Sequence, residues 1–148
     1  METVKWQVAE LAQGSVMDAR EHFQNVVVPS YTGFVQSPND FRLLSTALVH
    51  MNTVPEYLAF ERAGYPTHFP RNERRRVAEA IRVERDLKRV ETCANVLKHI
   101  RNDTKQGTLS STGIDPNNTT TWKIGEHDLS QVAHDGFIKL STIFRSSQ

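Results

Sequence analysis

The stretch "ETCANVLKHIRND", residues 91–103, carries four side chains that could hold an anion or move a proton. They are Asn95, Lys98, His99 and Arg101. Residues four apart share one face of a helix, so Asn95 and His99 are expected to align along the apolar stripe. A half-buried imidazole beside an amide and an ammonium group suits phosphate or nucleic-acid chemistry. The same cations also suit the last turn of a helix, where they interact favourably with the helix dipole.

A second histidine, His50, could complete such a site. It lies next to Met51 on the apolar side of an expected helix. If that helix packs antiparallel to the one with Asn95, two histidines can meet around the amide in one seam. The alternative is a core histidine that bonds a carbonyl group. The candidate binding residues are therefore His50, Asn95, Lys98, His99 and Arg101, and in a nuclease His99 would be the catalytic proton-transfer residue.

Other catalytic and metal-binding patterns are weak in this chain. There is no HExxH motif, no pair of cysteines and no glycine-rich phosphate loop. Asp18 and His22 are four apart and could share a metal with His50, but an exposed ion pair is the simpler interpretation. His127 and His134 are seven apart, too far along a helix for one zinc ion. We expect no metal and no cofactor.

Length and composition indicate one helical domain over residues 1–148. Apolar residues make up 38% and charged residues 24%, which fits a small globular protein and excludes a wholly disordered chain. The single cysteine, Cys93, excludes an internal disulfide. Neither a signal-peptide pattern nor a membrane-length apolar run is present, so a soluble, cytoplasmic protein with no membrane partner is expected.

Charge is unevenly distributed along the chain. Residues 71–105 carry eleven Lys and Arg against six Asp and Glu, although the whole chain has a net charge of +1. This surplus points to an anionic partner, nucleic acid or nucleotide. The alternative is a helix with a solvated, salt-bridged face, since "RNERRR" and "RVERDLKR" mix both signs.

Apolar periodicity and capping residues predict the helices of the first half. The first helix is expected over residues 2–26, with Pro29 ending it and an extended or irregular segment after it. The next helix is expected to begin at Ser37, where Asp40 would complete a capping box. Pro55 falls inside its apolar pattern and is expected to kink or split it.

The second half predicts one long helix, a β element and a closing helix. Residues 70–103 carry an apolar stripe of more than five turns and are expected to form one helix. Residues 102–121 predict a long loop or irregular hairpin, and "TTWKIGEH" a strand with a turn at Gly125. Asp128 is expected to cap the last helix, in which Gly136 is a weak point.

The fold class expected from these elements is mainly α. Short connections between the long helices predict antiparallel neighbours, and their apolar stripes need one another to be buried. The expected architecture is a small antiparallel helical bundle with a short β-strand or hairpin before the last helix.

Three segments resemble a group of small, uncharacterised bacterial helical proteins. They are "DFRLLSTALVHMNTVPEYL", "CANVLKHIRN" and "WKIGEHDLSQVAHDGFIKLSTIF". In that group a helix containing a histidine precedes an Ala-Asn-x-x-Lys-His helix, and a glycine-turn strand precedes the final helix. The resemblance covers most of the chain in outline, and its specific residues are His50, Asn95, Lys98 and His99.

A looser similarity is to HEPN helical domains, several of which are metal-independent ribonucleases. Their signature is an arginine, commonly followed by a polar residue, four to six positions before a histidine. Here Asn95 stands four before His99, and the nearest upstream arginine is Arg89, ten before it. "RAGYPTH" has the nominal spacing, but its glycine and proline disfavour a helix. The chain therefore departs from the HEPN signature.

Three functions remain open on the sequence. The first is a non-catalytic binding or regulatory module that holds an anionic partner, nucleic acid or nucleotide, through the His/Asn/Lys seam. The second is a HEPN-like metal-independent ribonuclease. The third is a homodimeric protein-interaction bundle.

Overall fold

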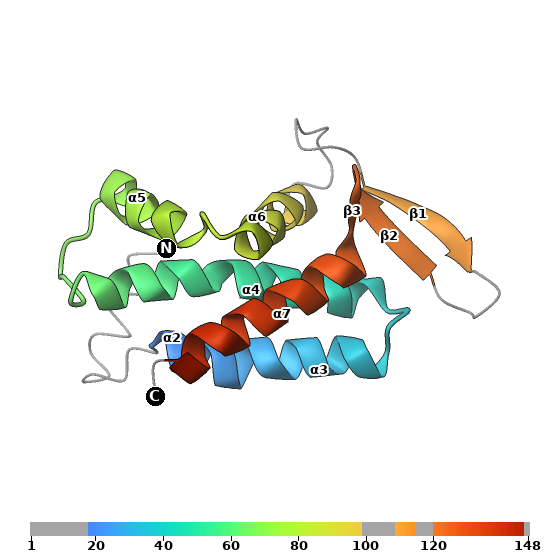
Figure 1. The fold of residues 1–148 in the computed structure, drawn as a ribbon, viewed down its shortest axis with the longest axis horizontal. Coiled ribbons are helices and arrows are strands. Elements are labelled where there is room, and N and C mark those ends of the chain that lie inside the picture. The colour runs from blue at the N-terminus through green and yellow to red at the C-terminus, as the bar shows by residue number, and fades with distance from the viewer. Residues whose placement is uncertain (1–17, 99–108, 115–119, 147–148) are drawn as a thin grey trace.

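The protein is mainly helical, with a small antiparallel sheet before its final helix, as the sequence predicted. The computed structural model describes residues 18–98, 109–114 and 120–146. A central helix, α4 (Phe41–Arg62), packs against α3 (Val28–Gln36) on one side and against α5 (Arg71–Ile81) and α6 (Arg85–Lys98) on the other (Figure 1). The closing helix α7 (Leu129–Ser146) crosses α4 and α6.

The first described helix continues past Pro29, so the prediction that Pro29 ends it was wrong. Helix α2 (Ala19–His22) leads into a π-helical turn, η1 (Phe23–Val27), and then into α3. In the π turn the N–H of Val28 bonds to the oxygen of Phe23, five residues back. The α-helical hydrogen-bond pattern is therefore already interrupted where Pro29 lacks its donor. The predicted part before residue 18 lies outside the described residues.

Helix α4 begins later and runs further than predicted. Its N-cap is Asp40, whose Oδ1 accepts from the N–H of Leu43 at 3.2 Å, while Ser37 instead ends α3. Pro55 is buried inside the helix and does not split it, so the alternative of two separate pieces was wrong. The side chains of α4 that fill the core are Leu44, Ala47, Leu48, Met51, Val54, Leu58 and Ala59.

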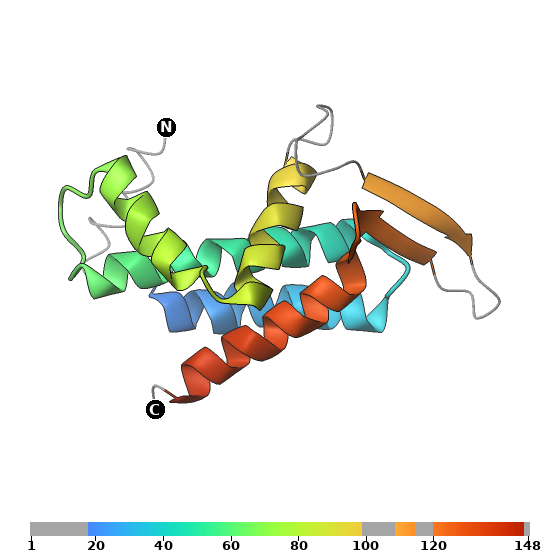
Figure 2. The same ribbon diagram turned by 45° about the horizontal axis from the view of Figure 1, so that its top comes forward.

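The predicted continuous helix over residues 70–103 is two helices. Figure 2 shows α5 and α6 meeting at a sharp turn above α4. Arg82 ends α5 and is buried, whereas Val83, which the apolar stripe placed in the core, is 83% exposed. The turn lets both halves pack on α4. Residues 99–103 of the predicted helix lie outside the described residues.

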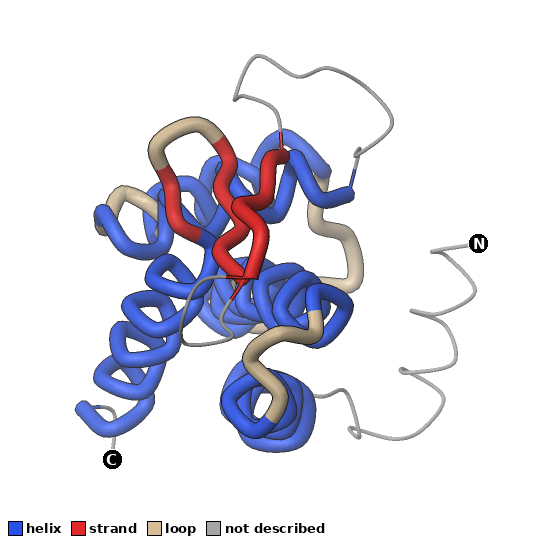
Figure 3. The backbone as a smooth tube through the Cα atoms, turned by 90° about the vertical axis from the view of Figure 1, so that its right-hand side faces the viewer, coloured by secondary structure: helices blue, strands red, loops and turns tan. Residues whose placement is uncertain are grey.

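The β element is a three-stranded antiparallel sheet in the order β1-β2-β3, and Figure 3 views the molecule from that end. Its strands are β1 (Leu109–Ile114), β2 (Thr120–Ile124) and β3 (His127–Asp128). Leu109 pairs with Ile124, and a positive φ of 58° at Gly125 allows the turn into β3. The predicted hairpin and glycine turn are confirmed.

Helix α7 is capped as predicted. Oδ1 of Asp128 accepts from the N–H groups of Ser130 at 3.0 Å and Gln131 at 3.3 Å. The buried side chains of α7 are Leu129, Val132, Ala133, Leu140 and Phe144. Val132 and Ala133 follow Leu129 by three and four residues, and Leu140 and Phe144 follow Ala133 by seven and eleven, spacings that keep them on one helix face. The apolar stripe in the sequence therefore correctly identified the core face of this helix.

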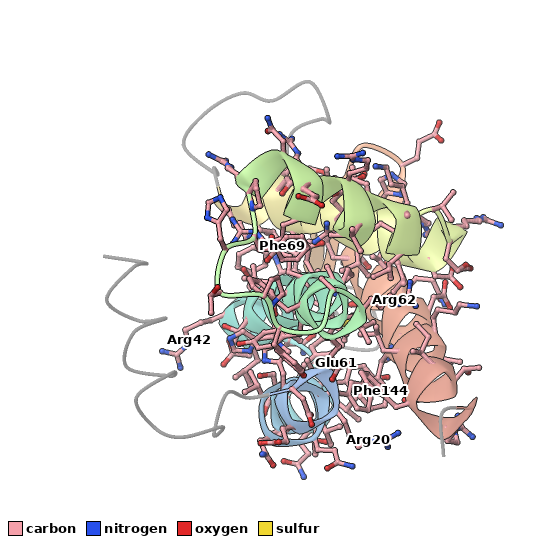
Figure 4. The ribbon with its side chains drawn as sticks, turned by 90° about the vertical axis from the view of Figure 1, so that its left-hand side faces the viewer. Arg20, Arg42, Glu61, Arg62, Phe69 and Phe144 are labelled. Carbon is pink, nitrogen blue, oxygen red and sulfur yellow. The ribbon has the colours of Figure 1, made fainter. Side chains whose placement is uncertain are left out.

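The opposite end of the bundle is closed by polar contacts at the start of α2. Glu61 of α4 accepts from the N–H of Ala19 at 3.0 Å, and Asp18 accepts from the N–H of Glu21 at 2.7 Å. A guanidinium nitrogen of Arg20 donates to the oxygen of Phe144 at 2.8 Å, near the end of α7 (Figure 4). Carboxylates therefore face a helix N-terminus and a cation faces a C-terminus, as the helix dipoles favour.

Candidate functional site

A polar pocket of about 220 Å³ lies between α4, α5 and α6. Its cationic lining residues are Arg71, Arg74, Arg75, Arg82 and Lys98. Its acidic and amide lining residues are Glu56, Glu79, Glu91, Asn52 and Asn95. Ala78 is the one apolar residue among the described residues that line it. Five cations against three carboxylates leave a surplus of two positive charges.

Arg82 forms the base of this pocket and joins the three helices. Its side chain is 6% exposed, and its Nη2 donates to the backbone oxygen of Asn52 at 2.7 Å. Its Nε donates to Asn52 Oδ1 at 3.2 Å and lies 3.5 Å from Glu91 Oε2. Its Nη1 lies 3.4 Å from Glu79 Oε1. The buried charge is therefore paired and hydrogen-bonded, as a buried arginine must be.

The two central carboxylates are also paired with Lys88. Its Nζ lies 3.0 Å from Glu79 Oε2 and 2.7 Å from Glu91 Oε1. A hydrogen bond with Glu91 lowers the pKa of Glu79, whereas burial raises the pKa of Glu91. Hydrogen bonds to both carboxylates, that of Glu91 first, raise the pKa of Lys88. Lys88 and Arg82 together therefore neutralise both carboxylates of the pair.

Other cations of the pocket are not engaged in this way. Arg71, Arg75 and Lys98 are exposed, and no side chain within the described ranges pairs with them. The guanidinium of Arg74 lies 5.6 Å from the centre of the Phe60 ring, a cation–π geometry that leaves its charge uncancelled. The pocket therefore presents uncompensated positive charge to solvent.

Asn52 supplies a fixed donor on the floor of the pocket. The residue is 6% exposed, and Arg82 holds its side-chain oxygen. Its amide nitrogen makes no hydrogen bond with a described residue. Among the described residues no side-chain nitrogen or oxygen is both buried and without a partner, so this nitrogen must reach the solvent space that Asn52 lines. A held amide N–H₂ aimed into a cationic pocket is a suitable donor to an anion.

The structure brings two of the predicted site residues together and places a third elsewhere. Asn95 and Lys98 both line the pocket. His50 lies elsewhere: its Nδ1 is 2.9 Å from Ser30 Oγ of α3. It does not line the pocket, although Asn52, two residues later, does. His99 and Arg101 lie outside the described residues.

His50 does meet a second imidazole, that of His22. The predicted partner, His99, lies outside the described residues. The ring centres of His22 and His50 are 6.4 Å apart, and the His22 ring stacks on Tyr57 at 4.4 Å. His22 Nε2 donates to the backbone oxygen of His50 at 3.1 Å and lies 2.6 Å from Thr53 Oγ1. His50 and Asp18 do not form a metal site with His22. No cluster of three metal-ligating side chains occurs in the part of the chain that is described.

We expect this histidine pair to make stability depend on pH. Burial lowers the pKa of both rings below the ordinary value of 6.5, and the charge of His50 further lowers the pKa of His22. The stabilisation is therefore complete above pH 6.5 and is lost as the pH falls from 6.5 through the folded-state pKa values. The free energy of unfolding from urea titrations should fall between about pH 7 and pH 5.

The matched control for this pH effect is the double variant His22→Gln/His50→Gln. Its unfolding free energy should fall less over the same interval, because the other titrating groups are unchanged. Equal slopes for the variant and the wild type would contradict the assignment to the two imidazoles.

Most residues of the pocket were missed from the sequence. Arg71, Arg74, Arg75 and Arg82 lie within the stretch 71–105, whose positive surplus was the available signal. In one continuous helix these arginines would lie several turns from Lys98 along the helix axis. The turn after Arg82 is what brings the α5 arginines and the end of α6 around one space.

Comparison with protein-family models, curated proteins and solved structures finds no match to this chain. The resemblances noted from the sequence therefore stay expectations, and function is inferred from the pocket. Over the described ranges, every helix is too short or too polar to span a bilayer.

Proposed function

We propose that the protein is a binding module for nucleic acid, and that the pocket between α4, α5 and α6 holds phosphate groups of the strand. The observation that supports this most directly is which charged side chains of the pocket are paired and which are not. The carboxylates Glu79 and Glu91 are already paired with Arg82 and Lys88. Arg71, Arg75 and Lys98 remain without a partner within the described ranges and face the same space. An anion entering there meets mobile cations around a fixed amide donor.

The lining favours phosphate over base. Bases are held by stacking on aromatic or apolar surfaces, and a nucleotide site carries such a wall. Ala78 is the one apolar residue among the described residues of this pocket. Contacts to phosphate carry no sequence information, so binding through this pocket is expected to be independent of base sequence.

Each element has a distinct role in this proposal. Helix α5 supplies arginines at positions 71, 74 and 75, which lie on one face because they are three and four apart. Lys98 supplies a point charge from the last turn of α6. Asn52 and Asn95 supply amide groups between the two cationic walls. The strand would therefore be held from two sides above a rigid floor.

Replacing Lys98 with glutamine is expected to weaken binding to a short single-stranded RNA and to reduce its salt dependence. Phosphate contacts from the three cations without a partner in the described ranges, Arg71, Arg75 and Lys98, predict a slope of log affinity against log salt of about −2. That slope corresponds to roughly a 20-fold loss of affinity between about 50 and 200 mM salt. Loss of one contact should bring the slope closer to zero by about 0.7. Fluorescence anisotropy over a salt series measures both quantities.

The matched control for this test is Lys123→Gln, which removes an exposed lysine on β2, away from the pocket. It should leave affinity and slope close to those of the wild type. If the wild type binds no RNA at low salt, the proposal is refuted. Equal losses of affinity in Lys98→Gln and Lys123→Gln would mean that RNA is attracted by the overall charge of the protein and not by this pocket.

The other two functions stay predictions. The ribonuclease would need His99, which lies outside the described residues, and His50 lies away from the pocket in a hydrogen bond with Ser30. Cleavage of the RNA probe that is lost in His99→Ala would select it. The homodimer would be selected by a doubled mass in light scattering.

A further inference from the structure

We infer that Lys88, which does not line the pocket, raises its affinity for phosphate by neutralising two of the three carboxylates that do, Glu79 and Glu91. This inference rests on the proposed function and concerns the control of that same site. Lys88 would therefore be a positioning residue, acting through Glu79 and Glu91 and not by touching the ligand.

Lys88 contacts the carboxylate pair from outside the set of residues that line the pocket. Its Nζ lies 3.0 Å from Glu79 and 2.7 Å from Glu91, and both of those residues line the pocket whereas Lys88 does not. Within the described residues, Lys88 therefore contacts the pocket only through these two carboxylates. The side chain of Lys88 is 54% exposed, so its charge can be removed without opening the core.

Arg82 cannot take over this role alone. Its guanidinium is buried and donates two hydrogen bonds to Asn52, one to the backbone and one to the side chain. Its contacts with Glu79 and Glu91 are longer, at 3.4 and 3.5 Å, than those of Lys88. Without Lys88, two carboxylates would share one guanidinium that is already held, and one net negative charge would face the pocket.

The consequence for binding follows from Coulomb's law. The uncancelled carboxylate would repel phosphate and would also attract the mobile cations Arg75 and Lys98 away from it. Interactions between unit charges near a protein surface are strong enough to change an affinity several-fold at short range. The charge of Lys88 thus strengthens the attraction of phosphate to a pocket that it does not enter.

The test measures the affinity of a fluorescent oligouridylate for Lys88→Gln at low salt. We expect binding about five-fold weaker than in the wild type, a size typical of one partly screened charge. Glu79→Gln in the same chain removes the exposed negative charge, so the double variant Lys88→Gln/Glu79→Gln should regain most of the lost affinity. Lys139→Gln is the matched control, because Lys139 also pairs with a glutamate, Glu84 at 3.9 Å, outside the pocket.

The outcomes separate this inference from the proposed function. Weak binding by Lys88→Gln with recovery in the double variant supports it, provided that thermal unfolding shows both variants folded. An affinity equal to that of Lys139→Gln overturns the role of Lys88 and leaves the pocket standing. Loss without recovery in the double variant also overturns it, because a lysine that touches the ligand cannot be replaced by removing a carboxylate. A wild type that binds no RNA refutes both.

Discussion

Replacing Arg82 with leucine is expected to destabilise the protein by about 3–5 kcal/mol, the cost typical of breaking a buried ion pair from one side. The change leaves Glu91, whose side chain is 15% exposed, with one cationic partner in place of two. It also removes both donors to Asn52, which is 6% exposed. For a chain of this length, the melting temperature should fall on the order of 10 °C, measured by circular dichroism.

The control for this result is Arg76→Leu on the same helix. Arg76 is exposed and does not line the pocket, so its stability effect should stay within about 0.5 kcal/mol. A variant Arg82→Lys should fall between the two, because an ammonium group keeps the charge but lacks the planar fork that makes both hydrogen bonds to Asn52. A melting temperature of Arg82→Leu equal to that of Arg76→Leu would show that α5 and α6 are not joined through this side chain.

The second large effect is expected at Gly136, where α7 approaches α6 and α4 most closely. A Cβ at this position would lie 2.6 Å from Cγ2 of Val90 and 3.5 Å from Sδ of Met51. In an exposed helix, glycine to alanine stabilises by about 1 kcal/mol. Here Gly136→Ala is expected to destabilise by about 1–3 kcal/mol, because the added methyl group overpacks the core. Urea unfolding measures the free energy and hence its sign.

Val90→Ala provides the compensating variant for this prediction. It removes the methyl group that Gly136→Ala would strike, so the double variant should be more stable than the sum of the two single changes implies. The interaction energy should be about 1 kcal/mol or more, as for side chains in direct contact. Additive effects would place the source of any destabilisation away from the contact between α6 and α7.

Sequence patterns predicted the fold well where apolar periodicity and capping agree. Helix α7 shows this: Asp128 caps it and Leu129, Val132 and Leu140 are buried at the predicted spacing. The prediction failed where one strong local rule was applied alone. Pro29 and Pro55 both lie inside helices, since a π turn precedes the first and tertiary packing buries the second. Local propensity is a weak signal against such packing.

The site was predicted in part for a similar reason. Asn95 and Lys98, two of the predicted binding residues, both line the pocket. Arg82 could not be identified, because a buried arginine looks like a surface residue in sequence and its partners Asn52 and Glu91 come from other helices. Nothing in the apolar stripe marked the turn at Val83, whose side chain fits the helical repeat and is 83% exposed. A pocket formed across a turn needs the tertiary structure to be seen.

Helix α5 buries few apolar side chains, Ala78 and Ile81 among its eleven residues. Polar and cation–π contacts also attach it to α4: Arg82 donates to the backbone oxygen of Asn52, and the guanidinium of Arg74 lies over the ring of Phe60. Elements with little apolar burial open locally at low free-energy cost. Helix α5 is therefore expected to exchange its amide hydrogens faster than the core helices, and a strand that bridges α5 and Lys98 would slow that exchange.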